Sequence, residues 1–236
     1  MPSPESRRAR IGGAALAIGA CLLVAYPLVL EPVLARAAVR TTALALLLVA
    51  GASLALPAPS ALAGARPPSW PRWAIAGLLV LAAVSERRVY LRLVPAFVYL
   101  GLAAFLQASL RGGDSLIHFA VRRAVPGAPD FVGPYCRALT RLWAGLLLGC
   151  ALLVAVLALG ASPASWAAWT GWRLYALMLV ASGIEFLVRK TLFRYYFRGG
   201  PFDRFWSRLF PAERTARGRR SAEAIRRYRE QSAATD

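Results

Sequence analysis

The sequence predicts an all-α fold: a polytopic membrane protein with about six transmembrane helices and additional interfacial amphipathic helices. Hydrophobic residues make up 58% of the 236 residues and the mean hydropathy is +0.51, both high for a soluble domain. In addition, residues 142–160 form an uncharged run of nineteen residues. A helix of that length can cross a hydrocarbon core of about 30 Å.

Positive charge is concentrated beside the apolar runs. The chain has 29 Lys+Arg against 11 Asp+Glu, a net charge of +18. In a soluble protein this excess would suggest nucleic acid, but no recognition fold is left once the apolar runs are removed, so we expect no nucleic-acid partner. Cations that flank apolar runs favour anionic lipid headgroups as partners instead.

The first three spans are expected at residues 11–30, 41–56 and 73–84. The first follows three arginines but is long for a signal peptide and lacks a small-x-small cleavage site, so we expect it to be retained. The proline-rich stretch 57–72 is predicted to be a loop. The third span has about twelve strongly apolar residues and could be re-entrant instead of crossing.

The last three spans are expected at residues 93–110, 142–160 and 172–188, with an uncharged loop at 161–171. The basic segment 111–141 is predicted to lie at the cytoplasmic interface. In the basic tail 189–236, residues 201–210 place their aromatic and leucine side chains on one helical face, which predicts a second interfacial helix. Residues 221–231 are predicted to be a short solvated helix.

The distribution of cations predicts the orientation. With the N-terminus in the cytoplasm, 23 of the 29 cations fall on the cytoplasmic side and 5 on the other. Because cytoplasmic loops carry an excess of Lys and Arg, both termini are expected in the cytoplasm. Arg87, Arg88 and Arg92 form the one cluster that this topology places outside.

Glu185 is the only acid well inside a predicted span. A charged residue there raises the insertion free energy by about 2.5–3.5 kcal/mol, so Glu185 is a candidate proton, cation or cargo site. The alternative is an ion pair with Arg189 one turn later, in the favourable Glu-before-Arg order. Arg173, at the start of the sixth span, is the other polar residue singled out within the membrane.

Asp114, His118 and Cys136 are the candidate catalytic residues. Asp114 and His118 have i, i+4 spacing and would share a helical face, as an acyltransferase pair requires. Alternatively, Asp114 caps the helix start and His118 lies at headgroup level beside Arg122. Arg137 could lower the pKa of the adjacent Cys136 thiol. With a single histidine and no C-x-x-C motif, no metal site and no disulfide framework is expected.

A basic cytoplasmic surface is predicted on the interfacial segments and the neighbouring span ends. Its members are Arg122, Arg123, Arg137, Arg141, Arg189, Arg204 and Arg208. Such a surface can hold anionic headgroups and can also dock acidic proteins.

Residues 91–190 resemble a family of uncharacterised bacterial inner-membrane proteins. The resemblance rests on LVPAFVYLGLAAFLQASL, DSLIHFAVRR, PDFVGPYCRALTRLW and GIEFLVRK, in this order. Members are encoded beside ketosynthase, acyl-carrier and acyltransferase genes of aryl-polyene or xanthomonadin-type lipid clusters. The resemblance implies the bacterial inner membrane and a context in lipid biosynthesis, and it supplies no catalytic residues to carry over.

Some members of that family are labelled ketosynthase, but this chain lacks the required residues. Ketosynthase condensation uses a cysteine with two histidines, or with histidine and asparagine, and this chain has one histidine and no asparagine. We expect an accessory protein of acyl or polyene lipid assembly that anchors soluble enzymes, of acyl-carrier or ketosynthase type, or their acyl substrate. A transporter or flippase of the lipid product and a membrane-embedded acyltransferase are the alternatives. No cofactor is expected.

Overall fold

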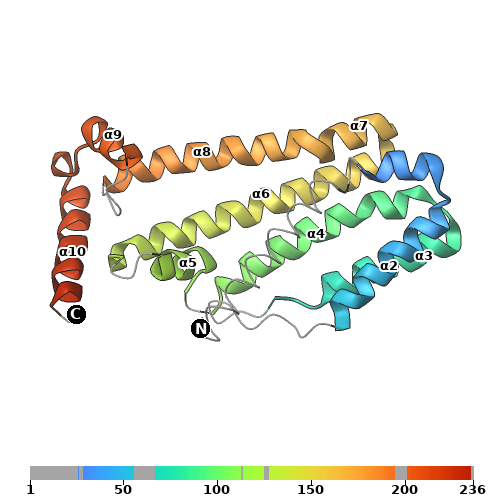
Figure 1. The fold of residues 1–236 in the computed structure, drawn as a ribbon, viewed down its shortest axis with the longest axis horizontal. Coiled ribbons are helices and arrows are strands. Elements are labelled where there is room, and N and C mark those ends of the chain that lie inside the picture. The colour runs from blue at the N-terminus through green and yellow to red at the C-terminus, as the bar shows by residue number, and fades with distance from the viewer. Residues whose placement is uncertain are drawn as a thin grey trace, which may run out of the picture. The chain divides into compact units, whose positions relative to one another are not determined.

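The computed structural model describes residues 26, 29–55, 67–112, 114–124, 128–194 and 201–234. In this part of the chain every regular element is a helix, which confirms the predicted all-α class (Figure 1). The chain divides into two compact units. Unit 1 comprises Met1–Pro59, Pro68–Ala103 and Leu146–Ala176, and unit 2 comprises Ser60–Pro67, Ala104–Gly145 and Leu177–Asp236. Each unit is described by itself.

Unit 1 contains α2 (Val39–Ala55), α3 (Trp70–Ser85), α7 (Pro163–Ala168) and the π-helical η2 (Trp169–Arg173). Unit 2 contains α5 (Leu116–Ala124), the 3-10 turn η1 (Asp130–Val132), α9 (Pro201–Leu209), the 3-10 turn η3 (Ala212–Arg214) and α10 (Ala216–Ala233). Three further helices contribute residues to both units: α4 (Arg88–Ser109), α6 (Gly133–Gly160) and α8 (Leu174–Phe193).

Two helices in the described residues are long and apolar enough to cross a membrane. They are Arg88–Ser109, with 22 residues, and Asp130–Gly160, with 31 residues. The prediction of six such helices is therefore wrong for the described part of the chain. With 17 and 16 residues, α2 and α3 fall short of the roughly 20 residues that a span needs, and the 20-residue α8 contains several charged residues. Most of the predicted span 11–30 lies outside the described residues.

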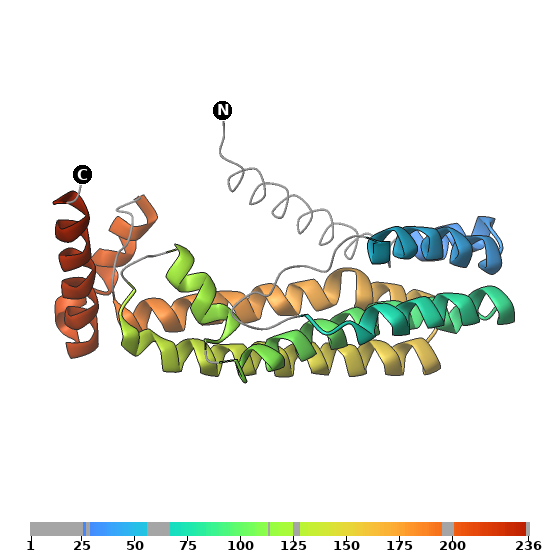
Figure 2. The ribbon, with the colours of Figure 1, turned by 90° about the horizontal axis from the view of Figure 1, so that it is seen from below.

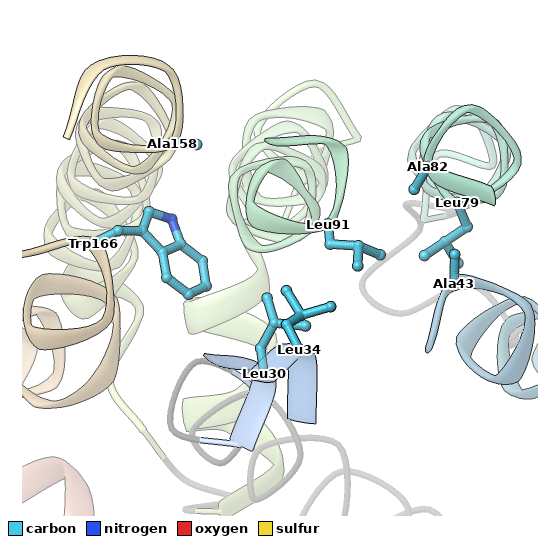
Figure 3. Packing of buried hydrophobic residues seen from close by; sticks show 8 residues of the cluster. All are labelled: Leu30, Leu34, Ala43, Leu79, Ala82, Leu91, Ala158 and Trp166. Atoms are coloured by element: carbon cyan, nitrogen blue, oxygen red, sulfur yellow. The ribbon is translucent and has the colours of Figure 1, made fainter. Parts of the chain in front are cut away.

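The core of unit 1 is built from leucine, alanine and one tryptophan (Figure 3). Its buried members are Leu30, Leu34, Ala43, Leu79, Ala82, Leu91, Ala158 and Trp166. Figure 3 shows Ala43 of α2 facing Leu79 of α3, while Leu30 and Leu34 point toward Leu91 of α4. Because alanine is small, the backbones of α2 and α3 can approach closely at this contact.

A second close approach in unit 1 joins the start of α3 to α4. A Cβ added at Gly101 would lie 2.9 Å from the Cβ and Cγ atoms of Pro71. Pro71 itself is tolerated in the first turn of α3, where a backbone N–H has no helical acceptor. Glycine is therefore needed at this position of α4 to admit the proline ring.

Two arginines of the cluster at 87–92 are held by contacts inside unit 1. The Nε atom of Arg92 lies 2.9 Å from Oε1 of Glu31, and the two side chains are only 11% and 19% exposed. Arg88 donates a hydrogen bond from Nη2 to the carbonyl oxygen of Leu34 at 3.4 Å. Of the three cations that the predicted topology placed outside, Arg92 therefore carries a paired charge, whereas Arg87 and Arg88 are exposed.

The predicted loop 161–171 is mostly helical. The Ser162 hydroxyl accepts a hydrogen bond from the Ser165 N–H at 3.2 Å, and a proline occupies the first helical position, so α7 has a well-capped start. The π-helical turn η2 then continues into α8. Within η2 the guanidinium of the exposed Arg173 lies 5.2 Å and 5.6 Å from the ring centroids of Trp169 and Trp172, so the cation lies against two aromatic rings.

The helix α6 begins before the predicted span and runs without a break for 28 residues, or about 42 Å. The predicted interfacial segment 111–141 is therefore α5 followed by η1 and the first turns of α6. Figures 1 and 2 show α5 beside these first turns. Ile117 and Val121 of α5 pack there, against a cluster that includes Val132.

The predicted amphipathic helix at 201–210 is present as α9. Trp206 stacks on Phe210, with ring centroids 5.4 Å apart, and meets Phe186 of α8 edge to face at 5.9 Å. Phe205 and Leu209 remain exposed. On the aromatic face of α9, Trp206 thus contacts α8 while Phe205 is exposed. The sequence had predicted that this whole face would contact lipid.

The predicted short solvated helix at the C-terminus is longer and has a buried face. The 18 residues of α10 include Ser221, which is fully buried, and Ile225, which packs beside Cys136 and Phe193. A Cβ at Gly218 would lie 2.6 Å from the Ala212 carbonyl oxygen. One face of α10 therefore packs against the other helices of unit 2.

Candidate functional site

The candidate site is one region of unit 2, which we call the basic end: α5, the first turns of α6, the last turns of α8, α9 and α10. Its apolar centre consists of Val132, Cys136, Phe193 and Ile225. The Tyr135 ring meets Phe193 edge to face, with centroids 5.1 Å apart. Aromatic packing therefore fixes the helices on which the charged side chains are carried.

Glu185 has two polar partners at the basic end. The Tyr135 hydroxyl donates a hydrogen bond to its Oε1 atom at 3.1 Å, and Nε of Arg189 lies 3.3 Å from the same atom. The carboxylate is 16% exposed. The pair with Arg189 is therefore formed, as the alternative interpretation of Glu185 predicted. The contact with Tyr135 was not foreseen, since nothing in the local spacing points to a partner 50 residues away.

His118 and Asp114 are brought together on α5 and the turn before it. Nδ1 of His118 lies 3.0 Å from Oδ1 of Asp114, and Nη1 of Arg122 lies 3.5 Å from Oδ2. The His118 side chain is 13% exposed, and a Cβ at Gly133 would lie 3.5 Å from its Cε1 atom. The ring is thus held between a carboxylate and the start of α6. Chemically, such a carboxylate can orient an imidazole for proton transfer.

The structure corrects the predicted cap of α5. The Ser115 hydroxyl, and not the Asp114 carboxylate, accepts the hydrogen bond from the His118 N–H, at 3.3 Å. Asp114 is consequently left for His118 and Arg122. No group of three or more potential ligands that could hold a metal ion occurs among the described residues.

Cys136, which the sequence made a candidate catalytic residue, is buried. Its side chain is 1% exposed within the apolar centre of the basic end. Arg137 is turned elsewhere, since its Nη2 donates to the Leu110 carbonyl oxygen at 3.0 Å, where a cation also suits the negative end of α4. A thiol in apolar surroundings is a poor nucleophile, so Cys136 is a packing residue.

The predicted basic surface divides into two groups. Arg122, Arg137 and Arg189 have partners within unit 2, as described above. Arg123, Arg141, Arg204 and Arg208 are exposed. Only the second group is available to a partner without first breaking a contact.

Sequence reasoning missed the arginines of α10. Arg217, Arg220 and Arg227 recur at i, i+3 and i+10 and so share a helical face, next to the buried face of Gly218 and Ser221. That spacing was visible in the sequence. The high charge of the segment conceals this face, because charge is typical of a helix that is solvated on every side.

No protein-family model, curated protein or solved structure matches this chain. The described residues define an α-helical protein with two helices long and apolar enough to cross a membrane and a basic end packed on aromatic rings. The resemblance of residues 91–190 to a lipid-cluster family stays a prediction.

Proposed function

We propose that this protein is a polytopic protein of the bacterial inner membrane, with its basic end in the cytoplasm. The supporting observation is an exposed apolar stripe on α6. Leu148, Leu152, Val156 and Leu159 follow one face of the helix and are between 43% and 72% exposed. Only 28% of the most apolar window of this helix is buried, so it is unlike the core helix of a soluble protein. Lipid is the natural neighbour for such a surface.

The shorter helices α2 and α3 and the more highly charged α8 also expose large apolar side chains. Leu48 on α2, Val84 on α3 and Leu179 on α8 are 77%, 80% and 74% exposed. A bilayer accommodates a short apolar helix by thinning locally, and flanking cations reach the headgroups. These helices therefore join α4 and α6 as proposed membrane segments.

Extraction of isolated membranes tests this location. We expect the protein to stay in the pellet after alkaline carbonate and after high salt, and to be released by detergent. An integral protein is held by lipid-facing apolar area, which neither salt nor high pH removes. Release by high salt would instead assign the protein to the membrane surface and contradict the proposal.

Within that membrane we propose an accessory role in acyl or polyene lipid assembly, in which the basic end holds soluble enzymes or their acyl substrate at the bilayer. The carrying observation is the set of exposed arginines Arg123, Arg141, Arg204 and Arg208. Acidic proteins of the acyl-carrier type have the complementary charge, and such attraction steers association and weakens with salt. The resemblance of the middle of the chain provides the biosynthetic context.

Charge reversal tests the docking role. We expect Arg123→Glu with Arg141→Glu and Arg208→Glu to abolish co-purification of an acyl-carrier protein at low salt. The matched control reverses Arg36, Arg40 and Arg87, which are exposed in unit 1. Equal recruitment by both triple variants would refute the role. Arg137 is left unchanged because its bond to Leu110 is structural.

A membrane-embedded acyltransferase is the second candidate, because His118 and Asp114 form the pair that such chemistry needs. The test is His118→Gln, which keeps a polar side chain but cannot take up a proton. Loss of the acylated lipid product with unchanged membrane insertion would support catalysis. Continued production of that lipid would exclude it.

A transporter or flippase is less well supported. Its proposed site, Glu185, already has Tyr135 and Arg189 as partners, which favours a structural role for the carboxylate. Export of the lipid product in a Glu185→Gln variant measures this directly. Unchanged export would remove Glu185 from any transport mechanism.

A further inference from the structure

A groove of about 530 Å³ in unit 2 has no role in the account so far. It lies between α10 and the segment that leads into α6, and its walls include Asp130, Phe131, Arg220, Arg227 and Tyr228. A smaller pocket of about 120 Å³, lined by Phe131, Arg217 and Arg220, shares two of these residues. A narrow basic pocket thus opens beside a wider groove with aromatic walls.

The groove carries a strong positive charge on a fixed scaffold. Three arginines face one acid, Asp130, and none of the three forms an ion pair among the described residues. Arg217 lies 5.9 Å from the Phe193 ring centroid, which limits its movement. Arginine forks match the oxygen atoms of phosphate groups, and two of them converge on the small pocket.

The position of the groove along α6 indicates which phosphate can reach it. Asp130 precedes the uncharged run by twelve residues, or about 18 Å of helix. The headgroup layer on one side of a bilayer is only about 5–8 Å deep. Given the proposed membrane location, on which this step rests, Arg141 lies at headgroup level and the groove lies in the water beyond it. A soluble ligand therefore fits better than a lipid headgroup.

We propose that the groove binds a soluble phosphate ester with a slender organic chain. The phosphate occupies the pocket of Arg217 and Arg220, and the chain lies along Arg227 and Tyr228, where the aromatic walls offer apolar contact. The ester is either a free small molecule or a group attached to a carrier protein. Both present the same phosphate chemistry to the arginines.

Binding is tested with the full-length protein in nanodiscs of zwitterionic phosphatidylcholine. Coenzyme A serves as the soluble phosphate ester and inorganic phosphate as the minimal anion, each titrated by calorimetry. We expect saturable binding of coenzyme A that is weakened about tenfold or more by Arg220→Gln, since the phosphate loses a charged hydrogen-bonding partner. The matched control is Arg226→Gln, an exposed residue on the opposite face of α10.

Absence of saturable binding, or equal weakening by Arg220→Gln and Arg226→Gln, overturns the proposal. A second set of nanodiscs contains phosphatidylglycerol; if this lipid blocks coenzyme A, the groove belongs to headgroups and the proposal is also overturned. Carrier-bound and free esters are separated by comparing a phosphopantetheinylated carrier protein with coenzyme A. Charge reversal of Arg123, Arg141 and Arg208 tests recruitment of a carrier protein, whereas the nanodisc titration tests binding of coenzyme A in the groove. Either result can be negative while the other is positive, so the docking proposal and the groove proposal are tested separately.

Discussion

Each unit combines partnered and exposed arginines, but the ion-paired arginine of unit 1 is less exposed than that of unit 2. In unit 1, Arg92 is paired with Glu31 inside the fold, and Arg88 is bonded to a backbone carbonyl. In unit 2, arginines such as Arg141 and Arg208 stay exposed beside the partnered ones. The number of cations in a segment therefore does not show whether the segment is a binding surface. What distinguishes a binding surface from a structural pair is whether the charge already has a partner.

The two units also differ in the residues that build their cores. The core of unit 1 is mainly leucine and alanine with the buried Trp166, whereas the centre of unit 2 is built around Phe193, with Phe131 and Tyr135 in ring contact with it. A tyrosine contributes apolar area and also a hydroxyl for hydrogen bonding. Unit 2 can therefore hold Glu185 in place while its other charged groups face outward.

The largest effect is expected at the partly buried pair of Arg92 and Glu31 in unit 1. Arg92→Gln leaves the Glu31 carboxylate without its cation and should destabilise the protein by about 3 kcal/mol, the lower end of the cost at a fully buried pair, measured by thermal unfolding in detergent. Glu31→Gln should cost a similar amount, and the double variant less than the sum of the two. Arg87→Gln, an exposed neighbour, is the control and should change stability by less than about 0.5 kcal/mol.

The next effect concerns the docking of α10. Gly218→Ala places a methyl group 2.6 Å from a backbone oxygen and should cost roughly 1–3 kcal/mol, because the backbone must move. At Gly183, in α8 of the same unit, an added Cβ meets nothing within 4 Å. Gly183→Ala should therefore be neutral or stabilising. Equal melting temperatures of the two variants would contradict the close packing of Gly218 against the turn η3 that precedes α10.

A smaller effect is expected at the hydrogen bond to Glu185. Tyr135→Phe keeps the ring contact with Phe193 and removes the hydroxyl, so the loss should be about 1 kcal/mol, since Arg189 still partners the carboxylate. Tyr135→Ala removes the ring as well and should cost clearly more. Unfolding of both variants in detergent measures the difference. If both variants lose the same stability, the ring contact contributes nothing.

The smallest effect on stability is expected for the exposed arginines of unit 2. Arg123→Gln, Arg141→Gln and Arg208→Gln should each change the free energy of unfolding by less than about 0.5 kcal/mol. The same unfolding assay measures them beside Arg92→Gln. If any of these variants lost as much stability as Arg92→Gln, exposed and partnered arginines would not differ in their contribution to stability.

Much of the local structure could be predicted from the sequence. The all-α class, the apolar run of α6 and the amphipathic helix α9 follow from composition and periodicity. The pair of Glu185 with Arg189 follows from i, i+4 spacing. Each of these depends on residues within a few turns of one another, where the pattern itself carries the information.

What could not be predicted depends on contacts between distant segments. Glu31 and Arg92 are 61 residues apart, and no periodicity links them. The burial of Cys136 depends on Phe193 and on Ile225 of α10, so its neighbour Arg137 misled the interpretation. The buried face of α10 was missed because charge was taken as a sign of full exposure.

The measurement that tests the central claim most directly is the accessibility of single cysteines from each side of the membrane. In a chain without its three native cysteines, Ala233→Cys reports on α10 and Ala164→Cys on α7, both at exposed positions. A membrane-impermeant maleimide should label position 233 only in inverted vesicles and position 164 only in intact spheroplasts. Labelling of position 233 in intact spheroplasts would place the basic end outside the cytoplasm and contradict the account.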